Sequence, residues 1–150
     1  MSLAIALHVL SAIVWIGGMF FALLVLRPVS GELEPELRLL LWERVFRRFF
    51  PWVWMAIPLL VVSGYWMIFS KWGGFANLPL HIHLMQGIGW LMILVFLHLW
   101  FAPYKRFRRA LAGDDLPPAA DNLNRIRILV TINLVLGILN AVIGASGRYW

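Results

Sequence analysis

Four long apolar stretches alternate with short polar or basic segments along the chain. The first, 3–26, has no Asp, Glu, Lys or Arg in 24 residues. As a helix it is about 36 Å long, whereas the hydrocarbon core of a bilayer is about 30 Å thick. Comparable stretches follow at about 51–70, 80–101 and 128–146. This pattern predicts an all-α fold, a four-transmembrane-helix bundle that forms a single integral membrane domain over 1–150.

Residues 35–50 have a different, amphipathic pattern. Their charged side chains gather toward one face of a helix, and apolar and aromatic side chains cover much of the rest. The pattern is typical of a helix that lies in the membrane interface with its arginines among the headgroups. A helix that leads directly into the next span would have the same pattern. Pro51 suits a helix start, and Pro58 predicts a kink in the second span.

Composition agrees with this pattern. The chain is 62% hydrophobic and 13% charged, whereas a soluble domain has about 25% charged residues. It is therefore expected to be an integral membrane protein whose main partner is the lipid bilayer. The absence of cysteine excludes disulfides, thiolate metal sites and covalently attached c-type haem. No nucleotide fingerprint, phosphate-binding loop or Ser-His-Asp set is present, and no carboxylate lies within a span.

The positive charges predict the topology. Of the 13 Lys and Arg residues, 11 lie in the segments that follow the first and third spans, and Lys71 and Arg148 are the other two. The positive-inside rule places the basic segments in the cytoplasm. Both termini then lie outside a bacterial-type inner (cytoplasmic) membrane. The same rule explains the net charge of +6 without a nucleic-acid partner.

Helical periodicity predicts which faces turn toward other helices. In the first span one side of the helix carries small and polar residues together with one aromatic residue: His8, Ser11, Trp15, Gly18 and Ala22. In the fourth span an equivalent stripe is Asn133, Gly137, Asn140 and Gly144. In the second span Ser63 and Gly64 form a small pair that permits close approach. Such faces pack against other helices, and an imidazole within a membrane is a functional-site candidate.

The third span presents two alternatives, because His81 and His83 lie about 200° apart around a helix. His83 shares its face with Gln86 and Gly87. That face is small and polar at its outer half, so we expect it to point inward. The face of His81 is apolar and includes Met85 and Met92, and it is expected to meet lipid or a hydrophobic neighbour.

These positions make haem b the first cofactor candidate. His8 and His83 fall at similar depth near the outer ends of their spans and would ligate haem iron from its two axial sides. Lys71 and Arg148 are the outer cations available to bind the propionates. His98 lies about 22 Å further in than His83, which gives it the weakest claim. A purely structural role, in which His8 and His83 only form hydrogen bonds, is the simpler alternative.

A different metal is the other alternative. The pattern His81-x-His83, with Met85 and Met92 below His81, offers imidazole and thioether groups. These ligand types suit copper. Methionines at helical spacing also pack ordinary helix interfaces.

The first span also carries a family resemblance. His8 followed by Trp15, Gly17 and Gly18 resembles the opening of CopD-like membrane proteins and HemJ-type protoporphyrinogen oxidases. Residues 80–84 (LHIHL) are similar to the HemJ-type pattern Leu-His-Val-Lys-Leu. The basic segment after the third span is similar as well.

The HemJ-type resemblance implies a helical bundle with b-type haem, an iron ligand at His8, and oxidation of protoporphyrinogen IX. His83 stands where the HemJ type has a lysine, and it would supply a second iron ligand. The CopD-like resemblance implies copper uptake.

The sequence thus predicts a membrane redox protein that binds b-type haem. It would transfer electrons to a membrane electron acceptor, or act as an oxidoreductase on a porphyrin or another small substrate. The alternative is a CopD-like copper-handling protein without haem, and the third class is a structural membrane subunit. An apolar exterior with an interfacial helix is compatible with a homodimer.

Overall fold

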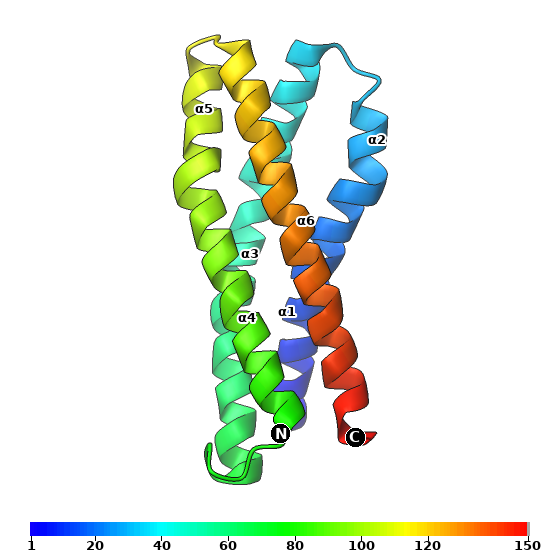
Figure 1. Ribbon diagram of the computed structural model, residues 1–150, viewed down its shortest axis with the longest axis vertical. Helices are drawn as coiled ribbons and strands as arrows, with labels where there is room; N and C mark the ends of the chain where they lie inside the picture. The colour runs from blue at the N-terminus through cyan, green and yellow to red at the C-terminus, as the bar shows by residue number, and fades with distance from the viewer. Residues whose placement is uncertain (150) are drawn as a thin grey trace.

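Four long helices run side by side in the computed structural model, which describes residues 1–149 apart from the side chain of Arg148 (Figure 1). The first long helix comprises α1 (Ser2–Phe21), η1 (Ala22–Leu26) and α2 (Arg27–Ser30). The second is α3 (Pro35–Trp72). The third comprises α4 (Leu80–Leu99), η2 (Trp100–Tyr104) and α5 (Lys105–Ala112). The fourth is α6 (Leu116–Ser146), which ends in the 3-10 turn η3 (Gly147–Tyr149).

These helices confirm the predicted fold class. Within residues 1–149, four helices are long and apolar enough to cross a membrane. Both termini and the turn at 73–79 lie at one end of the bundle, and the turns at 31–34 and 113–115 lie at the other (Figure 1). We call the first the histidine end, because His8, His81 and His83 lie toward it. We call the second the basic end, because the 11 clustered cations lie toward it.

The amphipathic segment 35–50 is not a separate interfacial helix. It is the first part of α3, which continues through Pro51 and Pro58 for 38 residues, about 57 Å. Its apolar side chains face the bundle interior, where Leu39, Trp42, Phe46 and Phe50 are buried. The sequence allowed either an interfacial helix or a helix that leads directly into the next span, and the structure has the second. The buried stripe continues past Pro51 to Val53, which explains why the second span has no boundary there.

The first long helix also extends beyond its expected end at Arg27 and Pro28. It reaches Ser30 through a π-helical turn, η1, that directly precedes this pair. A second π-helical turn, η2, contains Pro103. Proline lacks the N–H that would bond to the carbonyl four residues earlier, and its ring crowds that carbonyl. A widened turn relieves the crowding, so both helices continue toward the basic end.

Candidate functional site

His8 lies half-buried between α1 and α3. Its Nδ1 atom is 3.0 Å from the Ser63 hydroxyl oxygen. Gly64 lies directly against the ring, since a Cβ atom added at Gly64 would be 3.3 Å from Cε1 of His8. On the same face of α1, Ser11 and Trp15 are buried. The predicted inward face of the first span, and the close approach at the Ser63–Gly64 pair, are both confirmed.

The hydrogen bonds of Ser63 define the tautomer of His8. The Ser63 hydroxyl donates to the backbone carbonyls of its own helix, chiefly that of Leu59. A hydroxyl has only one hydrogen, so toward His8 its oxygen acts as an acceptor. This arrangement favours the tautomer in which His8 Nδ1 carries the proton and donates it to Ser63. The Nε2 atom is left with its lone pair, which is the form of imidazole that binds a metal.

On α4 the apolar face of His81 is the packed one. Met92 on that face is only 4% exposed, so this face has the hydrophobic neighbour that the sequence offered as one alternative. His83 and Gly87 are exposed, and Trp90 and Leu94 on the same stripe are 47% and 60% exposed. That stripe still turns partly toward α3, because Trp90 Nε1 donates to the Tyr65 hydroxyl at 3.1 Å. The expectation of an inward face is therefore wrong at His83 itself.

The reason that the His81 face packs is shape. Two large side chains of α4 lie opposite glycines of antiparallel α6, Met85 against Gly144 and Met92 against Gly137. His81 lies against Gly147, the first residue of η3. A Cβ atom at Gly144 would be 2.8 Å from the Met85 methyl carbon, and one at Gly137 would be 3.1 Å from that of Met92. We call these three pairs the α4–α6 seam. Long side chains that fill the space beside glycines gain dispersion contacts on all sides. This gain outweighs the tendency of the small polar stripe of α4 to pack inward.

The predicted stripe on the fourth helix is confirmed, because it lines this seam. Asn133 is buried, and its Nδ2 atom donates to the backbone carbonyl of Met92 at 3.2 Å. Asn140 lies beside Gly89, with its Nδ2 atom 3.9 Å from the position of an added Cβ. The Oδ1 atom of Asn140 and the Nε2 atom of Gln86 are buried without a hydrogen-bond partner.

Lys71 and His98 lie apart from this seam. Lys71 is exposed at the end of α3, with its ammonium group 4.6 Å from the centre of the Trp72 ring. His98 is exposed on α4. The side chain of Arg148 lies outside the described part of the chain. Binding of haem propionates by Lys71 and Arg148 stays a prediction.

The histidine pair proposed for haem loses one of its supports, since His83 does not share the interior with His8. Ligation of iron by His8 and His83 is untested by this geometry and stays a prediction. Among the described residues no three His, Cys, Asp or Glu side chains come together to hold a metal ion.

Two features of this end escape sequence reasoning. The hydrogen bond between His8 and Ser63 could not be predicted without the relative register of α1 and α3. The Ser63–Gly64 pair indicated only where another helix would approach. The seam was hidden because Met85 and Met92 read as an ordinary apolar face. The sequence feature that could have revealed the seam is the spacing of the glycines toward the end of the chain, which is similar to the spacing of the large side chains on the third helix.

Comparison with known proteins gives one family. The family model described as "Copper resistance protein D" matches residues 43–146. No curated protein and no solved structure matches the chain. The match confirms the CopD part of the resemblance, and the HemJ part stays a prediction.

Proposed function

The chain belongs to the copper resistance protein D family, and from this premise we propose that it is a multi-pass membrane protein that moves copper ions through its helical bundle. This is the alternative that the sequence offered beside haem. Copper is the cargo in this proposal and not a resident cofactor. The haem b and redox predictions have no support in the family match. The observation that carries the proposal is the α4–α6 seam.

The donor groups of the seam suit monovalent copper. Cu⁺ is a soft ion that prefers thioether and imidazole ligands. His81, Met85 and Met92 follow one another along a single helix face, from the histidine end toward the middle of the bundle. Cysteine is absent from the chain, so methionine supplies the only sulfur.

Two buried amides near the histidine end support a path rather than simple packing. The Oδ1 atom of Asn140, on α6, and the Nε2 atom of Gln86, on α4, are buried without hydrogen-bond partners. An unpaired polar group within a membrane costs several kcal/mol. Such a group in a native structure marks a place for a water molecule or an ion. We therefore place the copper path beside Met85 and these two amides.

His8 provides a second donor near the same end. Its Nδ1 proton is held by Ser63, so the ring presents Nε2 as a ligand atom. His83 is exposed on the outer part of α4 and would capture copper at the surface. The positive-inside rule places this end outside the cytoplasmic membrane, so copper would travel from the histidine end toward the basic end.

Transport into liposomes tests the proposal. Purified protein is reconstituted in liposomes that contain a Cu⁺ chelating dye, and Cu⁺ is supplied with ascorbate as reductant. We expect the parent chain to give copper-dependent dye signal above that of empty liposomes. Met85→Leu keeps the side-chain volume and removes the sulfur, so uptake should be at least about tenfold slower, the scale of losing one metal-site partner.

Matched variants separate copper binding from packing. Met55→Leu is the control, because Met55 lies on α3 with 57% of its surface exposed, and its uptake should equal the parent's. Met85→His restores a donor and should recover part of the uptake. If the parent chain moves no copper, the proposed function is wrong. If Met85→Leu transports like Met55→Leu, copper does not use the seam.

A further inference from the structure

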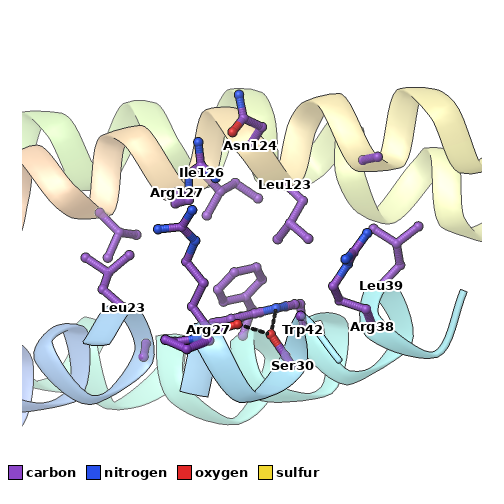
Figure 2. Close-up of a pocket in the computed structure, with 16 residues that line it drawn as sticks. Leu23, Arg27, Ser30, Arg38, Leu39, Trp42, Leu123, Asn124, Ile126 and Arg127 are labelled. Carbon is purple, nitrogen blue, oxygen red and sulfur yellow. Dashed lines mark hydrogen bonds between the residues drawn. The ribbon is translucent and has the colours of Figure 1, made fainter. Parts of the chain in front are cut away.

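A cavity of about 610 Å³ opens at the basic end, away from the seam (Figure 2). It lies between the end of the first long helix, the start of α3 and the start of α6. Its apolar wall includes Leu23, Trp42 and Ile126. Three arginines line it from three different segments: Arg27 on α2, Arg38 on α3 and Arg127 on α6. Figure 2 shows the side chains of Arg27 and Arg38 on opposite sides of the cavity.

These three arginines have no carboxylate partner within the described chain. The only ion pair among the described residues joins Arg47 to Glu43, at 3.5 Å on the outside of α3. No acidic residue lines the cavity. Three guanidinium groups around one hollow repel one another unless an anion lies between them. Guanidinium groups bind phosphate oxygens through paired hydrogen bonds, so the chemistry of the cavity selects a phosphate group.

The floor of the cavity is held rigid by a buried hydrogen-bonded chain. Trp42 Nε1 donates to the Ser30 hydroxyl oxygen at 3.1 Å, and that hydroxyl donates to the backbone carbonyl of Arg27 at 2.9 Å (Figure 2). The bond anchors the backbone from which the Arg27 side chain extends. It also satisfies the polar groups of the floor, so the arginines on the rim remain the groups available to a ligand.

A second cavity of about 390 Å³ adjoins the first. The two share Ala22, Phe46 and Val130 in their walls. The second cavity extends along α1 and α3 toward the middle of the bundle, past Gly18 and Phe49. Its lining is apolar apart from Arg48. A cationic cavity beside an apolar cavity suits a ligand that has a polar head and a hydrocarbon tail.

We propose that this pair of cavities binds an anionic glycerophospholipid from the cytoplasmic leaflet. The phosphate lies among Arg27, Arg38 and Arg127, and an acyl chain fills the apolar cavity. Basic pockets between transmembrane helices on this side of a membrane are suited to anionic headgroups. Free phosphate would use the first cavity alone, and a zwitterionic lipid would lack the net charge.

Thermal unfolding in the presence of added lipid tests the proposal. Protein in neutral detergent, stripped of lipid, is titrated with dioleoylphosphatidylglycerol and followed by tryptophan fluorescence. A ligand that binds only the folded chain raises Tm, and we expect a rise of roughly 5 °C. The combined variant Arg27→Gln/Arg38→Gln/Arg127→Gln should weaken apparent lipid affinity about a hundredfold.

The control variant Arg106→Gln/Arg108→Gln/Arg109→Gln removes the same charge from the same end but touches neither cavity. It should keep the parent's shift. An equal shift with dioleoylphosphatidylcholine, or with inorganic phosphate at matched ionic strength, would overturn the proposal. So would a cavity variant that responds like the control.

A measurement on the parent chain keeps the proposal testable if the cavity variant does not fold. Phosphatidylglycerol with a photoreactive group in its acyl chain should label residues within 18–22 or 45–52, which line the apolar cavity. Labelling confined to other parts of the chain would refute the assignment. Neither experiment involves copper, so the outcome is independent of the proposed transport.

Discussion

The two halves of the bundle are packed in different ways. Toward the basic end, aromatic rings from α3, α4, η2 and α5 form a continuous cluster. Phe46 and Phe50 are stacked at 5.0 Å, Phe50 meets Tyr104 edge-on at 4.8 Å, and Phe107 is completely buried. Toward the histidine end, the buried positions are mostly small or polar, and Ser11, Ser63 and Gly147 are examples. Many large apolar side chains there are exposed, although Trp15, Ile68 and Met92 are buried.

The physical environment explains the difference. The helices are 29 to 38 residues long, about 44–57 Å, and exceed the roughly 30 Å hydrocarbon core. The excess length must lie at the basic end, because the clustered arginines cannot remain in hydrocarbon. Stacked and edge-on contacts between the rings hold the helices together in the aromatic cluster. At the histidine end the helices associate through small residues and polar contacts, as is usual within lipid.

This contrast predicts that stability depends more on the basic end than on the histidine end. A rigid aromatic cluster holds the helices in register at the basic end. The histidine end, with His8, the α4–α6 seam and its unpartnered amides, is left able to accommodate a ligand. Substitutions at the basic end should therefore cause large losses of stability, and substitutions at the histidine end should cause small ones.

The largest expected effect comes from the aromatic cluster. Phe50→Ala removes a ring that contacts Phe46, Phe96 and Tyr104. The free energy of unfolding should fall by about 3–5 kcal/mol, as for other buried aromatic truncations. The measurement is denaturant unfolding followed by tryptophan fluorescence.

The matched substitution at the histidine end is Phe75→Ala. Phe75 lies in the 73–79 turn and is 49% exposed, although it contacts Tyr65 and Phe69 edge-on. Its loss should cost no more than about 1 kcal/mol, since exposed substitutions change stability little. Equal losses at the two positions would show that the basic half does not hold most of the stability.

A second, smaller effect lies midway between the halves, where α1 packs on α3. Gly18 is in contact with the ring of Phe49, so a methyl group there would overlap the ring. Neighbouring Gly17 has open space around it. Gly18→Ala should destabilise the chain by about 1–3 kcal/mol through overpacking. Gly17→Ala should leave stability unchanged or raise it by up to about 1 kcal/mol, because alanine favours a helix. The same unfolding measurement compares the two, and equal effects would contradict the close packing of α1 on α3.

The contrast between the halves also shows what the sequence could predict. Apolar length predicted the four helices, because about 20 consecutive apolar residues suit a membrane-spanning helix, whose backbone groups are all bonded within the segment. Stripes of small residues correctly predicted the buried faces around His8 and along Asn133 to Gly144. These features depend on residues within one helix.

The features that sequence reasoning missed depend on two helices at once. Whether His81 or His83 faced inward was decided by the glycines of α6, which accept Met85 and Met92. The continuity of α3 through Pro51 was left open between two alternatives, because it depends on the buried stripe before and after that proline, which packs in the bundle. The three arginines of the lipid cavity come from three separate segments, so no local pattern could place them together.

The smallest expected effect on stability, and the most informative one on function, concerns Ser63. Ser63→Ala removes the acceptor that holds the Nδ1 proton of His8. An interhelical hydrogen bond within a membrane contributes only about 0.6 kcal/mol, so the unfolding free energy should change by less than about 1 kcal/mol. Ser70→Ala is the control on the same helix, because Ser70 is exposed.

The effect on His8 should nevertheless be large, because the Ser63 oxygen, 3.0 Å from Nδ1, favours a proton on that ring nitrogen. In the parent chain, ¹⁵N NMR of labelled histidine should show His8 protonated at Nδ1 and bare at Nε2. In Ser63→Ala both tautomers should be populated, and copper uptake should fall although the fold persists. In Ser70→Ala neither the tautomer nor uptake should change. A His8 that is protonated at Nε2 in the parent chain would mean that Ser63 donates to the ring instead. The imidazole would then present no free lone pair to copper. His8 would not be a copper ligand, and only the α4–α6 seam would supply donor groups.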